Sequence, residues 1–188
     1  MIVGLAGYAR SGKDTAADVF VDNGFIRVAF ADLLKEFVYT VNPYVVDEGG
    51  YGVVHRLQDI VDAGGWEAAK HYPESRRLLQ VTGTEAARRL LGQNIWIDAV
   101  FNSMQTGEDY VISDVRLKNE RDRVKDAGGF MVWVHKPGVG PSSHITESDL
   151  SEHDCDHVFV NSGALAEYRV IVGDLLDQIW KGSRGKHS

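Results

Sequence analysis

The chain has 188 residues, of which 44% are hydrophobic and 25% charged, a balance typical of one globular domain with a sizeable core. Its formal net charge of −7 argues against a broad basic surface, so we expect no nucleic-acid partner. The single cysteine, Cys155, excludes an intramolecular disulfide, and no run has the length or flanks of a membrane span or secretory leader. These features predict a cytoplasmic protein without a membrane partner.

The first elements expected along the chain are a strand, a glycine-rich loop and a helix. The apolar run Ile2–Ala6 has the length of a strand. From Lys13 onward apolar residues recur at helical spacing, and Asn23–Gly24 is a typical helix end. A second short strand is expected at Phe25–Phe30, followed by a helix from Leu33 to about Thr40.

Residues 43–73 are interrupted by glycine and proline, and we interpret them as an insertion over a sheet rather than a separate domain. Thr82 and Glu85 have the spacing of a capping box, which predicts a helix start. The helical stretches expected in this part of the chain are 55–62, one containing Arg76–Leu79, one that begins near Thr82 and ends at Gly92, and one from Asn94 to Met104.

Strands and helices alternate in the remaining chain. The expected strands are 109–113, 130–135 and 157–160, and the expected helices are 118–127 and an amphipathic one from Leu165 to Ile179. A polar loop runs from Pro137 to Asp154. The alternation predicts an α/β fold with a parallel sheet covered by helices on both faces.

The loop after the first strand fits the phosphate-loop pattern. Its residues are Gly7, Tyr8, Ala9, Arg10, Ser11, Gly12 and Lys13. Glycines let backbone N–H groups turn inward toward phosphate oxygens, and a helix N-terminus adds partial positive charge. Lys13 can reach the β- and γ-phosphates of a nucleoside triphosphate. The next position, which usually supplies a Mg²⁺ ligand, is Asp14, followed by Thr15, and either could support the metal.

Among phosphate-loop proteins, a small kinase fits this chain best. GTPases carry an Asn-Lys-x-Asp motif that is absent here, and motor or transporter ATPases usually need a longer chain. Two alternatives remain: a kinase that acts on another small molecule, such as dephospho-coenzyme A, and a non-catalytic nucleotide-binding regulator. Substrate competition would separate the first, and a lack of acceptor-dependent turnover would identify the second.

Several short motifs, in order along most of the chain, resemble phage-type deoxynucleoside monophosphate kinases. They are Ser11-Gly12-Lys13-Asp14-Thr15, Arg76-Arg77-Leu78-Leu79-Gln80 with Gly83-Thr84, Ser113-Asp114-Val115-Arg116, His144-Ile145-Thr146-Glu147 and Asn161–Gly163. The resemblance is weakest at residues 43–73. It includes Asp14, since these kinases share this departure from the general phosphate-loop pattern. It implies an adenylate-kinase-like fold with a phosphate-loop core, a helical monophosphate-binding insertion at about 41–105 and a lid at about 137–154. It also implies ATP, Mg²⁺ and a deoxynucleoside monophosphate acceptor.

The acceptor side of this reaction would use the segment with two arginines. Arg76 and Gln80 are four residues apart and can share a helix face, and an arginine fork suits a monophosphate. The resemblance favours Arg77 and Gln80 as acceptor ligands, while the alternative for this group is a solvated helix face. Asp32 could equally cap the helix that follows it or contact the acceptor.

Asp114 and Arg116 follow an apolar strand, and the carboxyl ends of parallel strands form the ligand crevice in such folds. Asp114 could hold Mg²⁺ through water or cap the next helix, and Arg116 could clamp a phosphate. By resemblance, His144 and Glu147 belong to the lid and meet substrate there, the alternative being exposed loop positions. Asn161 either reads the adenine edge or makes a turn.

The expected mechanism is direct transfer. The loop amides, Lys13 and Mg²⁺ hold ATP, while Arg77 and Arg116 hold the acceptor phosphate in line. His153, Cys155 and His157 alternate as on a strand face, but packing explains them better than zinc, because no fourth ligand is evident. The sequence leaves open whether the protein is a homodimer.

Overall fold

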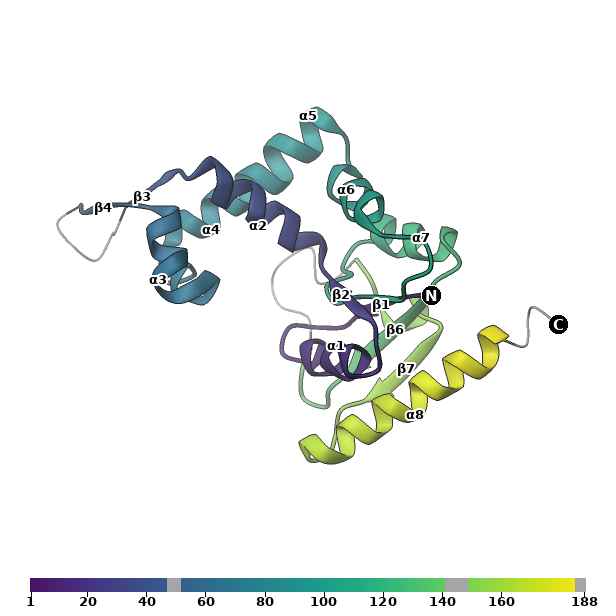
Figure 1. Ribbon diagram of the computed structural model, residues 1–188. Coiled ribbons are helices and arrows are strands. Elements are labelled where there is room, and N and C mark those ends of the chain that lie inside the picture. The colour runs from purple at the N-terminus through teal and green to yellow at the C-terminus, as the bar shows by residue number, and fades with distance from the viewer. Residues whose placement is uncertain (47–51, 141–148, 185–188) are drawn as a thin grey trace. The chain divides into compact units, whose positions relative to one another are not determined.

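The computed structural model describes residues 1–46, 52–140 and 149–184 (Figure 1). The chain forms two compact units, one made of Met1–Ala29 with Ser103–Ser188 and the other of Phe30–Asn102. The second unit is therefore a continuous segment inserted into the first. Its start at Phe30 lies earlier than the expected insertion start near residue 41, since the helix that follows the second strand belongs to it.

The first unit is a parallel sheet with helices on both faces. Its strands are β1 (Ile2–Ala6), β2 (Ile26–Val28), β5 (Tyr110–Ile112), β6 (Phe130–His135) and β7 (His157–Val160), and its helices are α1 (Lys13–Asp22), α7 (Lys118–Asp126) and α8 (Leu165–Arg184). The five strands pair in the order β2-β5-β1-β6-β7, and every pairing is parallel. The predicted α/β class is confirmed. Because β1 is central, the loop after it is flanked by the ends of β5 and β6.

The core of the first unit lies mainly between the sheet and two helices. Val3 and Leu5 of β1 are fully buried in one cluster with Phe20 of α1 and Tyr168 of α8. Successive residues of a strand face opposite sides of a sheet, and Gly4 accordingly lies against other side chains. Helix α7 packs against β1 and β6, and Figure 1 shows it on the side away from α1 and α8. Strands buried on both faces explain why β1 reads as a continuous apolar run.

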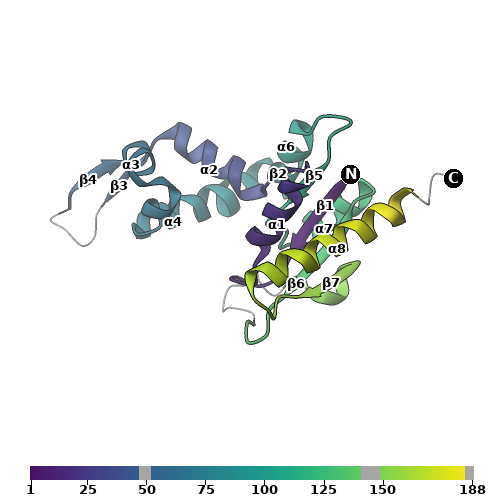
Figure 2. The ribbon, with the colours of Figure 1, turned by 60° about the horizontal axis from the view of Figure 1, so that its bottom comes forward.

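The second unit is helical with one small hairpin. Its elements are α2 (Phe30–Val41), β3 (Tyr44–Val46), β4 (Val54–Arg56), α3 (Leu57–Ala69), α4 (Pro73–Gln80), a π-helical segment (Val81–Arg88), α5 (Arg89–Leu91) and α6 (Ile95–Ser103). Strands β3 and β4 pair antiparallel, next to α3 in Figure 2. Val38, Val45, Leu57 and Ile60 form the buried centre of this unit. Helix α3 is kinked at Gly65, whose φ is 69°.

Three local predictions were wrong. The capping box at Thr82 and Glu85 does not start a helix, because Gln80 and Val81 have helical backbone angles and the run from Pro73 to Leu91 is unbroken. Helix α2 begins at Phe30, which shortens β2 and places Asp32 inside the first turn rather than at the N-cap.

The third concerns His153, Cys155 and His157, which do not share a strand. His153 lies in the 3₁₀ turn Glu152–Asp154, Cys155 follows it, and only His157 belongs to β7. Burial raises the pKa of the Cys155 thiol to about 12, so the thiolate is scarce at neutral pH. Within the described residues, no three His, Cys, Asp or Glu side chains gather as a metal site would require. None of the described helices is long and apolar enough to cross a membrane.

Candidate active site

The phosphate loop connects β1 to the N-terminus of α1. The Nζ atom of Lys13 donates hydrogen bonds to the carbonyl oxygens of Gly7 (2.7 Å) and Tyr8 (2.8 Å), so the ammonium lies across the mouth of the loop. Arg10, at the tip, has a φ of 63°, which is uncommon for a residue with a side chain. Strained backbone of this kind gathers at ligand-binding loops. The predicted strand, loop and helix are confirmed in this order.

Gly12 is the N-cap of α1 and no other residue fits there. Its φ is 105°, a conformation that side chains disfavour. A Cβ atom at this position would lie 2.5 Å from Nδ2 of Asn161 and 3.2 Å from the hydroxyl oxygen of Tyr168. The glycine therefore serves both the turn and the close approach of two side chains from the opposite end of the chain.

A small pocket opens on the inner side of the loop. Its walls are Gly7, Ala9, Lys13, Val115, Arg116, Trp133 and Leu150. Apart from Leu150, which precedes β7, these residues follow or belong to β1, β5 and β6, as expected if the carboxyl ends of parallel strands meet at one edge. The structure thus brings Arg116 to the same pocket as Lys13. Two cations at one small pocket suit an anion such as a phosphoryl group.

A larger cavity of about 420 Å³ lies on the other side of Lys13. It is lined by Arg10, Gly12, Lys13, Asp14, Thr15, Lys136, Asn161, Gly163, Leu165 and Tyr168. Its size and its mixture of cationic, polar and apolar groups suit the rest of a nucleotide. Five of the residues predicted to hold a nucleotide therefore lie here with Lys13.

The segment that carries Arg116 is held by a buried carboxylate. Glu120 is only 3% exposed, and one of its oxygens accepts hydrogen bonds from the backbone N–H groups of Arg116 (2.8 Å) and Leu117 (3.0 Å). Leu117 is the N-cap of α7. The alternative role of Asp114 as N-cap is therefore wrong, because α7 begins three residues further on than that role requires. Asp114 itself lies in the turn after β5.

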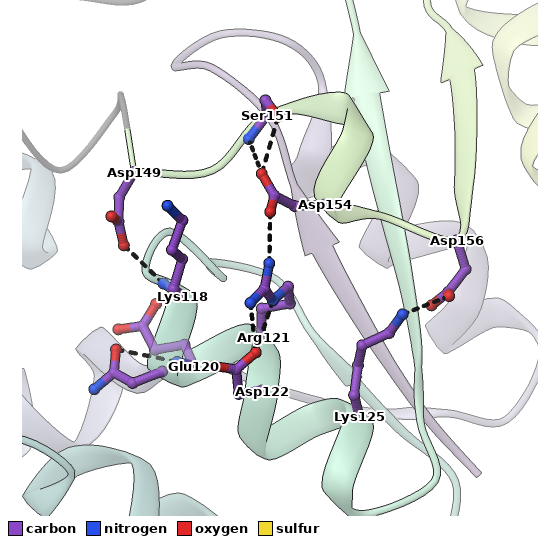
Figure 3. Close-up of polar contacts among 10 residues, drawn as sticks. Lys118, Glu120, Arg121, Asp122, Lys125, Asp149, Ser151, Asp154 and Asp156 are labelled. Carbon is purple, nitrogen blue, oxygen red and sulfur yellow. Dashed lines mark hydrogen bonds and ion pairs between the residues drawn. The ribbon is translucent and has the colours of Figure 1, made fainter.

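Helix α7 also binds the segment that leads into β7, as Figure 3 shows. The N–H of Lys118 donates to Asp149 (2.7 Å), and Lys125 pairs with Asp156 (2.7 Å). Arg121 pairs with Asp154, whose carboxylate also accepts from Ser151, and these Ser151 hydrogen bonds lower the pKa of Asp154. These contacts hold residues 149–156 against α7. They keep Leu150, which is buried, in the wall of the Lys13 pocket.

Asp14 is paired with a residue that the sequence did not single out. The NH2 group of Arg27 donates to Oδ1 of Asp14 (2.8 Å), and its Nε donates to the hydroxyl of Ser113 (3.2 Å). Arg27 lies on β2, Asp14 in the first turn of α1 and Ser113 at the end of β5. The guanidinium therefore links the first turn of α1 to the residue that follows β5.

Comparison with known proteins decides the family. A sequence model described as deoxynucleotide monophosphate kinase matches residues 68–171. The chain is also 30% identical over 184 residues to a putative deoxynucleotide monophosphate kinase of Acanthamoeba polyphaga mimivirus, with 89% of this chain and 92% of that protein covered. The chain belongs to the deoxynucleotide monophosphate kinase family.

Two further similarities accompany this result. The deoxynucleotide monophosphate kinase of Enterobacteria phage T4 is 31% identical over 98 residues, which cover 49% of this chain and 41% of that protein. Among solved structures, a dephospho-CoA kinase from Campylobacter jejuni aligns with 97% of this chain and 98% of its own, at 14% identity and a TM-score of 0.47.

In this member of the deoxynucleotide monophosphate kinase family, four of the predicted acceptor residues, Asp32, Arg76, Arg77 and Gln80, lie in the second unit, whereas Asp114 and Arg116 lie in the first. Arg77 is 61% exposed and its guanidinium meets Glu74, three residues earlier, through two hydrogen bonds of 2.7 Å. This contact lowers the pKa of Glu74 and raises that of Arg77. Arg76 and Gln80 are exposed on the same helix, and Asp32 accepts a hydrogen bond from Lys35 (3.1 Å). Their roles toward an acceptor stay predictions.

The π-helical segment explains the Gly83-Thr84 motif in part. A Cβ atom on Gly83 would lie 2.6 Å from a methyl carbon of Leu34, so α2 approaches this backbone closely. The carbonyl of Gly83 accepts a hydrogen bond from Nε1 of Trp96 (3.1 Å). The glycine therefore allows α2 and α6 to pack against the segment that follows Arg77. π-Helical turns are rare and often found at functional sites.

His144 and Glu147 lie outside the described residues, so their predicted place in a lid stays a prediction. Sequence analysis missed Arg27, Lys136 and Glu120, which line or support the site. Tyr168 was recognised only as part of an apolar helix face. Arg27 and Tyr168 have no local motif, since each contacts a distant part of the chain. Glu120 accepts from N–H groups only three and four residues earlier, so its signal is a glutamate in the first turn of α7.

Proposed function

We propose that this protein transfers the γ-phosphoryl group of ATP to a deoxynucleoside monophosphate, giving ADP and a deoxynucleoside diphosphate. The observation that carries the proposal is that Lys13 and Arg116 line one pocket beside a phosphate loop, in a chain of the deoxynucleotide monophosphate kinase family. Phosphoryl transfer needs alignment and charge neutralisation more than covalent chemistry. Lys13 on the loop and Arg116 after β5 supply the charge neutralisation.

The donor side of the reaction is assigned to the first unit. The phosphates of ATP lie against the backbone N–H groups at the N-terminus of α1, where a helix favours anions. The Lys13 ammonium then exchanges the Gly7 and Tyr8 carbonyls for phosphate oxygens. Arg116, whose backbone is anchored by Glu120, contacts the phosphoryl group from β5. The nucleoside part of ATP takes the larger cavity lined by Lys136 and Leu165.

Magnesium fits the residues at the start of α1. The hydroxyl of Thr15 and the carboxylate of Asp14 border the cavity beside Lys13, and Asp114 follows β5. Hydroxyl and carboxylate oxygens are the hard ligands that Mg²⁺ prefers. Held by these residues, the ion would neutralise charge that develops on the phosphoryl group. Because Asp14 is already paired with Arg27, we assign the direct contact to Thr15 and a water-mediated one to the carboxylates.

The acceptor side is assigned to the second unit. Arg77, with Arg76 and Gln80 on the same helix, supplies hydrogen-bond donors for a monophosphate, and Asp32 accepts from the acceptor nucleoside. Arg77 must release Glu74 for this purpose, and a doubly charged phosphate competes well with one carboxylate. The predicted lid at about 137–154, whose residues from 149 onward are held against α7, excludes water so that ATP is not hydrolysed.

A substrate screen tests the proposal. Purified protein with ATP and Mg²⁺ is offered each common nucleoside monophosphate and its deoxy form, and also dephospho-coenzyme A, while ADP formation and the phosphorylated product are measured. We expect ADP only with deoxynucleoside monophosphates and a matching diphosphate product. Turnover with dephospho-coenzyme A alone would replace this function by the related kinase activity. ATP binding without turnover on any acceptor would identify a regulator.

A further inference from the structure

Two side chains from the last part of the first unit hold consecutive carbonyl groups of the phosphate loop. The Nδ2 atom of Asn161 donates to the carbonyl oxygen of Ser11 (2.8 Å), and the hydroxyl of Tyr168 donates to that of Gly12 (2.8 Å). Asn161 follows β7 and Tyr168 lies in the first turn of α8. The donors are 150 and 156 residues away in sequence, so only the fold brings them here.

Holding a carbonyl also fixes the amide N–H of the next residue. A peptide group is planar and trans, so its C=O and N–H point in opposite directions. The Ser11 carbonyl is directed to Asn161, so the N–H of Gly12 points to the other side. The Gly12 carbonyl is directed to Tyr168, so the N–H of Lys13 also points away from these two side chains. These are the amides at the N-terminus of α1, where an anion binds.

The arrangement leaves little freedom for the loop to turn these peptides over. The Gly12 carbonyl also accepts the first helical hydrogen bond, from the N–H of Ala16 (3.0 Å). Tyr168 is 2% exposed, and burial raises the pKa of its hydroxyl, which keeps it a donor at physiological pH. Asn161 is fixed as well, since its backbone N–H donates to the carbonyl of His135 (2.7 Å).

The same contacts bear on the role expected for Asn161. Its side-chain amide must present NH₂ to Ser11, because a carbonyl oxygen only accepts. A residue whose amide is engaged with the loop is poorly placed to read a base. The contact is also built around Gly12, where a Cβ atom would displace both donors.

We propose that Asn161 and Tyr168 are positioning residues that orient the Gly12 and Lys13 amides of the phosphate loop toward the polyphosphate chain of the donor nucleotide. This inference rests on the proposed function in one respect: the proposed function places the polyphosphate of the donor nucleotide at the loop. The ligand they serve is the polyphosphate itself, and the base is recognised elsewhere. Catalysis benefits because the amides need no rearrangement when charge develops.

The test compares ATP with tripolyphosphate, which has the phosphates but no base or ribose. Dissociation constants for both are measured by calorimetry, without acceptor, on the wild type, Tyr168→Phe and Asn161→Ala. Each variant loses one neutral hydrogen bond, so we expect about 3- to 10-fold weaker binding. The loss should be equal for the two ligands. In turnover assays the KM for ATP should rise while the KM for the acceptor stays unchanged.

Matched controls exist in the same unit. Tyr110→Phe removes a buried tyrosine hydroxyl that accepts from the N–H of Gln105 (2.8 Å), and Asn23→Ala removes an amide that donates to the carbonyl of Val19 (2.8 Å). These two hydrogen bonds do not involve the phosphate loop, so both variants should bind tripolyphosphate as the wild type does. Thermal melting of all variants monitors folding. If Asn161→Ala does not fold, Tyr168→Phe carries the test alone, because it removes a single oxygen.

The outcomes separate this inference from the proposed function. Weaker ATP binding with unchanged tripolyphosphate binding would overturn the inference and assign Asn161 to the base. Unchanged binding of both ligands to the folded variants, or failure of the wild type to bind tripolyphosphate, would also overturn it. If the wild type and variants behave as expected but no deoxynucleoside monophosphate is phosphorylated, the positioning role stands and the proposed function falls.

Discussion

The phosphate loop and the Arg77 side chain are held by different kinds of contact. The loop is held by residues remote in sequence: Asn161 and Tyr168 reach it from other elements, and Arg27 holds Asp14 in the helix that follows it. Arg77 pairs with Glu74, one turn away on the same helix. Remote contacts fix the loop whether or not a ligand is bound. A local pair between the exposed Arg77 and the half-buried Glu74 is only weakly held, so Arg77 can change partner when an anion arrives.

The largest effect is expected at Lys13. Lys13→Ala removes the cation that the loop holds, and we expect turnover to fall by about 100- to 1,000-fold or more. Melting temperature should hardly change, since the remote contacts of the loop do not involve this side chain. Lys181→Ala, at an exposed position on α8, serves as the charge control. Near-normal turnover of Lys13→Ala would disprove the assignment of the loop.

The next effect is expected at Arg77. Arg77→Ala should weaken acceptor binding by about 10- to 100-fold, the loss of one or two charge-assisted hydrogen bonds. ATP binding should stay within about twofold, because the loop is held independently. Calorimetry with each ligand measures both. Equal losses for ATP and the acceptor would show that the two regions are not independent.

Two variants sharpen the Arg77 result. Glu74→Gln removes the carboxylate that competes for the guanidinium, so acceptor binding should be unchanged or tighter. Arg89→Ala, an exposed arginine further along the same helical run, should have no effect. Weaker acceptor binding by Glu74→Gln would mean that the ion pair orients Arg77 rather than competing with the ligand.

The smallest effect is expected at Arg27. The ion pair with Asp14 is exposed, and exposed pairs contribute little, so Arg27→Ala should lower kcat/KM by about two- to fivefold. Because Asp14 would then be released, the Mg²⁺ concentration for half-maximal activity should shift. Arg169→Ala, which removes the pair with Asp22 at the other end of α1, is the control. An identical Mg²⁺ profile in Arg27→Ala would show that the Arg27–Asp14 pair does not affect the metal.

The sequence predicted features that depend on contiguous residues. The phosphate loop, the parallel sheet and α8 follow from local patterns, since apolar spacing and glycine content are properties of one segment. The helix start at Thr82 was predicted wrongly for a physical reason. A capping box only offers hydrogen bonds to free N–H groups, and here the preceding turn of α4 already supplies the partners.

Other features have no local signal. Arg27 lies on a short strand, and nothing near it in the sequence indicates that its guanidinium meets Asp14 and Ser113. The hairpin of β3 and β4 consists of two three-residue strands, which carry too few alternations to be recognised. Asn161 could be flagged as polar after a strand, but its partner could be found only from the fold.

The insertion of the second unit has a consequence for how this enzyme family can diversify. Residues 30–102 leave the first unit after β2 and return before β5, so the polypeptide passes between the two units only twice. Every residue assigned to the donor nucleotide is encoded outside this segment. An exchange of this segment, by recombination or gene synthesis, would therefore replace Asp32, Arg76, Arg77 and Gln80 in one step and keep Lys13 and Arg116. The range of acceptor substrates could then diverge while the residues assigned to the donor nucleotide stay unchanged.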